Sequence, residues 1–121
     1  MTDHGHYHDV LKDLSTQHRA LRQDIPDVYK GFNDLSNAAL AEGALSTKVK
    51  ELMAMAIGVV HGCDGCIASH ARGAAKAGAT AKEAAEAIGV AILMNGGPAT
   101  IYGARAYAAF TEFAVDAPPA T

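Results

Sequence analysis

The chain lacks tryptophan and contains only two cysteines among its 121 residues. Its ten basic and thirteen acidic residues leave a net charge of −3, which provides no cationic surface of the kind that binds nucleic acid. No block of like charges is present, so a polybasic membrane-binding segment is not expected. The apolar runs fall far short of the roughly 20 residues that a membrane span requires. We therefore expect neither nucleic-acid nor membrane partners.

The beginning of the sequence, MTDHGHYHD, is polar and has no apolar segment after a basic start. We therefore expect no secretory signal peptide, and a cytoplasmic location is the simplest interpretation. In that compartment a close cysteine pair is more often catalytic, redox-sensing or metal-binding than a permanent structural disulfide. His4, His6 and His8 are expected to be disordered surface residues, with adventitious metal binding at most.

No alternation of apolar and polar residues with a period of two, the pattern typical of strands, stands out. Apolar residues instead recur at helical spacing almost throughout, which predicts about six helices joined by short loops, an all-α bundle. The length predicts one domain over residues 1–121, with flexible ends at 1–6 and 116–121 and a core motif at 46–95. The high alanine and glycine content fits close helix packing, and we expect subunit contacts to complete the core.

Local signals predict where the helices begin and end. Ser46 is a good N-cap, Asp64 is a possible N-cap, and Thr80 with Glu83 matches a capping box. The expected helices cover approximately 7–23, 26–43, 46–62, 64–78, 80–95 and 98–115.

The two cysteines, Cys63 and Cys66, form a C-x-x-C pair at the bend between the third and fourth expected helices. Thiols this close can cycle between dithiol and disulfide. His70 follows Cys66 by four residues, so both side chains project from one helical face. A helix N-terminus and a neighbouring imidazole both lower the pKa of a thiol and so favour the reactive thiolate. The pattern predicts redox chemistry at Cys66, with His70 as proton shuttle.

In the expected cycle, the Cys66 thiolate attacks a peroxide oxygen and becomes a sulfenic acid, and Cys63 then closes the disulfide. An external dithiol restores the thiols by exchange, and Cys63, nearer the bend, is its expected point of contact.

Glu51 is the candidate carboxylate for orienting His70. Along a straight helix it lies about 18 Å from Cys63, so direct contact with the cysteines is not expected. In an antiparallel hairpin His70 lies beside Met55 or Ala56, about one helical turn from Glu51. A long glutamate side chain, a bend near Gly58 or a bridging water would close this gap.

The residues leave other interpretations open. His61, two residues before Cys63, either assists the site or interacts with the end of the third helix. Together with Cys63, Cys66 and His70 it gives H-x-C-x2-C-x3-H, a donor set suited to tetrahedral zinc. A zinc-stabilised or redox-inert helical interaction module is therefore the alternative to an enzyme.

The combined pattern E-x11-C-x2-C-x3-H, formed by Glu51, Cys63, Cys66 and His70, resembles the alkylhydroperoxidase D-like core of the carboxymuconolactone decarboxylase family. The surrounding sequence is also similar to this family, with AIGVV before the cysteines, CIASH at the second one, and A-x-x-A-G-A-T-x-x-E-x-x-E-A after them. The resemblance covers about residues 45–94.

The resemblance implies an all-helical fold that assembles as a homo-trimer or homo-hexamer, and antioxidant activity that reduces hydroperoxides. It implies a peroxidatic role for Cys66, a resolving role for Cys63, and a proton relay through Glu51 and His70. No bound cofactor is implied, and a dithiol or a lipoylated carrier protein is the expected reductant.

The chain departs from the family pattern at one position. The best-known members place a second histidine directly before the second cysteine, where this chain has Gly65. The relay is therefore shorter, or His61 substitutes. Decarboxylase members lack the C-x-x-C, so its presence argues against that activity, and a decarboxylase or isomerase acting on a lactone-like substrate stays a third interpretation.

Overall fold

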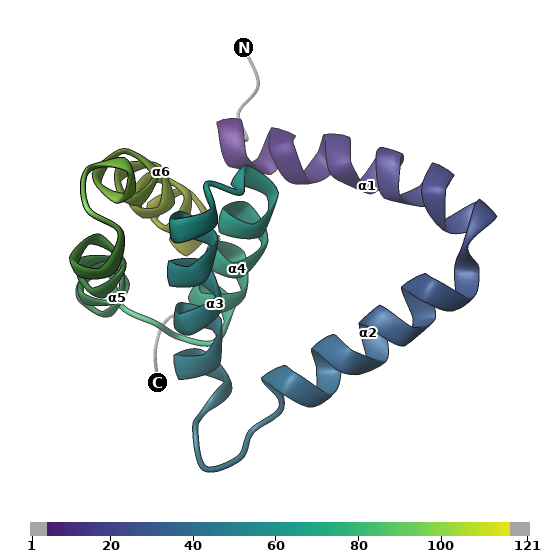
Figure 1. Cartoon of the computed structure of the whole chain (residues 1–121), viewed down its shortest axis with the longest axis horizontal. Coiled ribbons are helices and arrows are strands. Elements are labelled where there is room, and N and C mark those ends of the chain that lie inside the picture. Colours follow the sequence, from purple (N-terminus) through teal and green to yellow (C-terminus); the bar gives the residue numbers. More distant parts are fainter. Residues whose placement is uncertain (1–4, 117–121) are drawn as a thin grey trace.

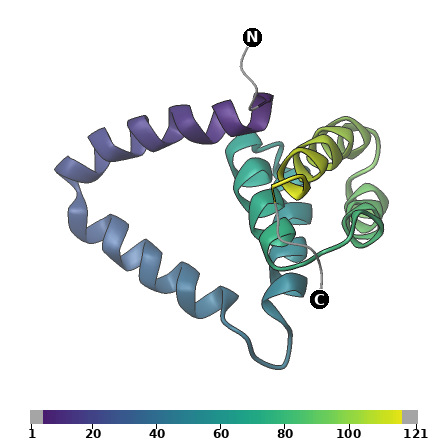
Figure 2. The ribbon, with the colours of Figure 1, turned by 180° about the vertical axis from the view of Figure 1, so that it is seen from behind.

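A computed structural model describes residues 5–116, which form six α-helices and no strand (Figures 1 and 2). The predicted all-α fold with six helices is therefore confirmed for this part of the chain. The helices are α1 (His6–Asp24), α2 (Pro26–Leu40), α3 (Thr47–His61), α4 (Asp64–Lys76), α5 (Ala81–Asn95) and α6 (Gly97–Ala114). None of these helices is both long and apolar enough to cross a membrane.

Helices α3 to α6 form the bundle that contains most of the core (Figure 1). Most of its buried side chains are alanines, and the largest fully buried ones are Phe110, Met55, Ile67 and Val59. At Gly58 the backbones of α3 and α4 approach so closely that an added Cβ would lie 3.3 Å from the Cβ of Cys66. The small residues thus allow the tight helix packing that the composition predicts.

Helix capping follows the sequence signals closely. The Ser46 hydroxyl accepts a hydrogen bond from the backbone N–H of Val49 at 3.1 Å, and Thr80 and Glu83 form the reciprocal capping box of α5. Helix α2 ends at Leu40 rather than near Gly43. The Thr47 hydroxyl donates to the Leu40 carbonyl at 2.7 Å, so a side chain satisfies that terminal carbonyl instead of a further turn.

The prediction of Asp64 as the N-cap of α4 is wrong, because Cys63 occupies that position. The Cys63 sulfur accepts a hydrogen bond from the backbone N–H of Cys66 at 3.2 Å. Asp64 is instead the first residue of the helix, and its carboxylate lies 3.8 Å from the guanidinium of Arg105 on α6. The cap of α4 is therefore one of the two cysteine sulfurs.

Helices α1 and α2 extend from the bundle as two arms that meet at an elbow, as both views show (Figures 1 and 2). Only the first turns of α1 pack onto the bundle, where Tyr7 is buried. Helix α2 contains no buried residue. Pro26 begins α2, where the missing N–H of proline has no cost.

The start of α1 is anchored to the end of α6. The His8 ring lies 2.5 Å from a Glu112 oxygen through Nδ1 and 2.9 Å from an Asp116 oxygen through Nε2. Glu112 also accepts the backbone N–H groups of Tyr7 and His8, which would otherwise be unpaired at the helix start. The expectation of disordered histidines is wrong for His6 and His8, which lie in α1, because the carboxylates of Glu112 in α6 and Asp116 just after it hold that end of α1.

The predicted flexible ends fall mostly outside the described residues, as does His4. Of the segments predicted to be flexible, the described residues are Gly5, His6 and Asp116, and the last of these contacts His8.

Candidate active site

The bend between α3 and α4 holds a disulfide between Cys63 and Cys66, whose Cα atoms are 5.2 Å apart. Gly62 precedes it with φ of 63°, a left-handed conformation that favours glycine. The backbone N–H of Cys63 reaches back to the Gly58 carbonyl at 3.1 Å and closes the end of α3. The predicted C-cap at Gly62 and the position of the C-x-x-C are confirmed.

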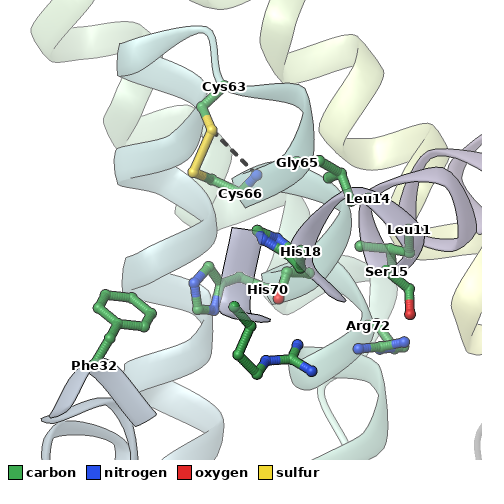
Figure 3. Close-up of a pocket in the computed structure, with 12 residues that line it drawn as sticks. Leu11, Leu14, Ser15, His18, Phe32, Cys63, Gly65, Cys66, His70 and Arg72 are labelled. Atoms are coloured by element: carbon green, nitrogen blue, oxygen red, sulfur yellow. Dashed lines mark hydrogen bonds between the residues drawn. A yellow bond between two sulfur atoms is a disulfide. The ribbon is translucent and has the colours of Figure 1, made fainter. Parts of the chain in front are cut away.

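Cys66 lies in the first turn of α4, at the positive end of the helix dipole. This position favours a negative charge on the Cys66 side chain. His70 is one turn further along the same face and borders the same pocket (Figure 3). Sequence spacing predicted this neighbourhood correctly.

The Glu51 carboxylate reaches His70 directly, with 2.6 Å between Oε1 and Nδ1. Both side chains are largely shielded, at 28% exposed for His70 and 13% for Glu51. An ionised carboxylate can only accept hydrogen bonds, so Nδ1 is the donor, and the Nε2 of a neutral ring keeps its lone pair. Glu51 thereby sets the tautomer as well as the orientation of the imidazole.

Gly73 explains how Glu51 spans the extra helical turn. It lies on α4, one turn beyond His70, and the Glu51 carboxylate occupies the space where its side chain would be. A Cβ added to Gly73 would overlap both carboxylate oxygens. The glutamate therefore lies across the backbone of α4 at Gly73, and its long side chain reaches the imidazole directly.

A pocket of about 650 Å³ opens beside the disulfide, bounded by α1, α4 and Phe32 of α2. Figure 3 shows the cysteines at one side of it, His70 further along α4, and Phe32 facing it from the opposite side. Twelve residues line it, namely Leu11, Leu14, Ser15, His18, Arg22, Phe32, Cys63, Gly65, Cys66, Ser69, His70 and Arg72. A small molecule in this space can reach the cysteine pair.

Helix α1 covers the position where the best-known relatives carry a second histidine. A Cβ added to Gly65 would lie 2.8 Å from the terminal methyl of Leu14, so a larger residue there requires α1 or the leucine to move. In this chain the apolar side chain of Leu14 thus occupies the space beside Gly65.

The two cysteines differ in exposure, and the order is the reverse of the expected one. In the disulfide form Cys66 is exposed, whereas Cys63 is partly buried at the bend. Cys63 is the N-cap, and its sulfur faces the first turn of α4, where it accepts the N–H of Cys66. The expectation that Cys63 is the more accessible cysteine is therefore wrong.

His61 does not join the site. It is exposed at the last position of α3 and does not line the pocket, and within residues 5–116 its side chain forms no hydrogen bond or ion pair. The zinc interpretation required His61, Cys63, Cys66 and His70 to converge. The two sulfurs are bonded to each other, His70 faces Glu51, and residues 5–116 contain no group of three such donors placed to hold a metal ion.

Sequence reasoning missed the contributions of α1 and of Arg72 to the pocket. Leu11, Leu14, His18 and Arg22 recur at helical spacing along one side of α1, but that spacing does not reveal which helix they face. Gly73 was missed as well, because a glycine inside a helix signals a close approach without naming the neighbour.

Comparison with known proteins gives consistent matches. Residues 26–109 match the model of the carboxymuconolactone decarboxylase family. An uncharacterized protein of Cupriavidus necator is 37% identical over 100 residues, which cover 83% of this chain and 88% of the relative. An uncharacterized protein of the cox locus of Paracoccus denitrificans is 40% identical over 81 residues, which cover 67% of this chain and 73% of the relative.

A solved structure is similar over nearly the whole chain. The crystal structure of an apo carboxymuconolactone decarboxylase family protein from Legionella pneumophila superposes with a TM-score of 0.86 at 42% sequence identity. The match covers 89% of this chain and 96% of the Legionella protein.

Proposed function

The chain belongs to the carboxymuconolactone decarboxylase family, and from this membership and the site geometry we propose that it is a thiol-dependent peroxidase. It reduces hydroperoxides through a dithiol–disulfide cycle of Cys63 and Cys66. One observation carries the proposal: a cysteine pair at a helix N-terminus borders the same pocket as an imidazole that a shielded carboxylate orients. That combination supplies a nucleophile, a resolving thiol and a proton carrier.

The first half of the cycle oxidises Cys66. His70 takes the thiol proton at Nε2, and the thiolate attacks one oxygen of the hydroperoxide. A sulfur–oxygen bond forms and the oxygen–oxygen bond breaks, so sulfur is oxidised to sulfenic acid and the peroxide is reduced. The departing alkoxide takes the proton back from His70 and leaves as an alcohol. Glu51 stabilises the transient imidazolium through Nδ1.

The second half resolves the sulfenic acid and restores the thiols. Cys63 attacks the Cys66 sulfur, a disulfide forms, and the sulfenic oxygen leaves as water with the Cys63 proton. An external dithiol, free or carried on a lipoylated protein, then reduces the disulfide and becomes a disulfide itself. Cys66 is its first point of attack in our proposal, because Cys66 is the more exposed of the two residues.

Single cysteine variants test the proposal. Peroxide consumption with excess dithiothreitol or dihydrolipoamide should be abolished in Cys66→Ser. Reduced Cys63→Ser that has been freed of dithiol should consume one peroxide per chain and then stop, leaving a sulfenic acid on Cys66 that dimedone traps and mass spectrometry detects. His61→Ala is the matched control, since this exposed histidine does not line the pocket, and it should retain full activity.

Other outcomes would identify other functions. Undiminished peroxide turnover in Cys66→Ser would contradict the peroxidatic role of this residue. Activity on a lactone that survives loss of both cysteines would indicate a decarboxylase-like enzyme. A wild-type protein whose thiols stay titratable in excess hydroperoxide would be a redox-inert helical module.

A further inference from the structure

The pocket lining has a charge opposite in sign to that of the whole chain. The chain has a net charge of −3, yet the twelve lining residues include Arg22 and Arg72 and no aspartate or glutamate. His70, which also lines the pocket, faces the Glu51 carboxylate at 2.6 Å, so the two arginines carry the positive charge of the lining. The pocket is therefore a cationic surface on an acidic protein, which favours an anionic ligand.

Neither arginine is neutralised by another residue in the part of the chain that the structure describes. Within residues 5–116, Arg22 and Arg72 form no ion pair, whereas Arg105 lies 3.8 Å from Asp64. The Arg22 guanidinium lies over the Tyr29 ring, 5.3 Å from its centroid. Stacking of this kind holds the plane of the guanidinium while its N–H donors stay available to a ligand.

The rest of the lining is largely apolar. Leu11 and Leu14 cover the pocket from α1, and Phe32 faces it from α2 although its side chain is 65% exposed (Figure 3). The volume of about 650 Å³ lies within the range of about 300–1,000 Å³ that is typical of small-molecule sites. Apolar walls combined with unpaired guanidiniums fit a ligand with an apolar body and an anionic group.

We propose that this pocket binds an apolar chain or ring that carries a carboxylate, with Arg22 and Arg72 holding the carboxylate. Guanidinium groups match the planar, two-oxygen shape of a carboxylate with parallel hydrogen bonds. Identifying this ligand as the substrate rests on the proposed function. The substrate is then a hydroperoxide that bears a carboxylate, with its peroxide group at Cys66 and its apolar part against Leu11, Leu14 and Phe32.

The test compares matched substrates that differ in charge. Para-carboxycumene hydroperoxide is compared with its methyl ester and with cumene hydroperoxide, all with the same dithiothreitol concentration. The wild type should use the acid with a kcat/KM about tenfold or more above that of the ester, as expected for a charge-assisted hydrogen bond. Equal kcat/KM for acid and ester in the wild type would overturn the proposal.

The arginine variants assign the preference to the pocket. Arg22→Gln and Arg72→Gln should remove the advantage of the acid over the ester, mainly by raising KM for the acid. Arg19→Gln is the control, because Arg19 is an exposed arginine of α1 that does not line the pocket, and it should keep the preference. A preference retained in both Arg22→Gln and Arg72→Gln would also overturn the proposal.

The reductant could carry the same chemistry, so a separate arm varies it. Dihydrolipoate and dihydrolipoamide differ in the carboxylate, and both are assayed with cumene hydroperoxide. If the arginine variants alter only the discrimination between these dithiols, the site serves the reductant and the substrate assignment is overturned.

A binding measurement separates this inference from the peroxidase proposal. Calorimetric titration of the disulfide form with decanoate should show binding that weakens in Arg22→Gln and Arg72→Gln but not in Arg19→Gln. Methyl decanoate should bind markedly less tightly than decanoate. Absence of decanoate binding would overturn the inference even where peroxide turnover is normal. If decanoate binds but no hydroperoxide is reduced, the peroxidase proposal alone has failed.

Discussion

At the scale of single residues, the site depends on Gly73, a glycine on α4. The contact between Glu51 and His70 exists because Gly73 leaves room for the carboxylate on the surface of α4. Glycine inside a helix costs about 0.5–1 kcal/mol of stability relative to alanine. At Gly73 this loss of stability accompanies a gain in geometry, because the open space lets the Glu51 carboxylate reach the His70 ring.

Gly73→Ala should therefore lower activity without lowering stability. The new methyl group displaces only the flexible end of Glu51, so the helices need not move, and the melting temperature should stay constant or rise. Loss of the oriented imidazole should lower kcat for hydroperoxide by roughly ten- to a hundredfold. Stopped-flow peroxide assays and thermal unfolding measure the two effects.

Gly89→Ala supplies the control for this substitution. Gly89 lies inside α5, and a Cβ added there would meet no atom within 4 Å. This variant should gain stability and keep its activity. A Gly73→Ala protein as active as Gly89→Ala would contradict the role of the glycine. The NMR chemical shifts of the His70 ring, which report its contact with Glu51, should change only in Gly73→Ala.

The sequence predicted the proximity of Cys63, Cys66 and His70 better than the contacts that Glu51 and Gly73 make around them. Cys63, Cys66 and His70 are close in sequence, so helical spacing alone brings them together. Glu51 needed the register between two helices, and Gly73 determines whether the carboxylate can reach. Such contacts depend on the distance between backbones, which a single sequence does not record.

At the scale of the elements, helix limits were predicted where local hydrogen bonds set them. Ser46 and Thr80 cap their helices through residues three positions away, so their pattern is visible in the sequence. The attachment of α1 to α6 joins residues that are 104 apart in the chain. No local sequence pattern indicates the contact between His8 and Glu112, so the sequence alone predicts disorder for the first histidines.

This attachment should make stability depend on pH. Hydrogen bonding to Glu112 raises the pKa of His8 above its ordinary value of 6.5; burial opposes this shift, and Asp116 adds to it. Burial alone would raise the pKa of Glu112, but the backbone N–H and ring of His8 and the N–H of Tyr7 together lower it below 4.5. The charged pair is thus favoured in the folded state.

The two shifts define a pH window for the stabilisation. The contribution of His8 is fully present below pH 6.5 and is lost as the pH rises through its raised pKa. The contribution of Glu112 is present above pH 4.5 and is lost as the pH falls through its lowered pKa. The melting temperature of the wild type should therefore exceed that of His8→Gln most between pH 4.5 and 6.5, and this difference should shrink at higher pH.

Thermal unfolding of both proteins from pH 4 to pH 9 measures the effect, with His61→Gln as a control that removes an exposed histidine without these contacts. A difference between wild type and His8→Gln that does not vary with pH would show that the ring acts only as a neutral hydrogen-bonding group.

At the scale of the whole molecule, the chain does not cover its own apolar surface. Val28, Phe32 and Leu35 recur at helical spacing on one side of α2, and each is at least 63% exposed. On α5, Leu93 and Met94 are 79% and 77% exposed. A helix with an apolar side and no buried residue needs a partner to be stable in its place. The alanine-rich core adds to this need, because it buries little area per residue.

We therefore propose that copies of the chain associate through Val28 and Leu35 of α2, on either side of the Phe32 that borders the pocket, as a homo-trimer or homo-hexamer. Light scattering after size-exclusion chromatography should give a mass three or six times that of the 12.5 kDa chain.

Leu35→Glu should shift the protein toward the monomer and lower its stability, since a charge in the contact is buried without a partner. Asn37→Glu, on the opposite side of the same helix, should keep the assembly intact. A monomeric wild type at micromolar concentration would contradict the proposal. Loss of assembly in both variants would show that α2 folds poorly with any added acid, rather than that its apolar side forms the contact.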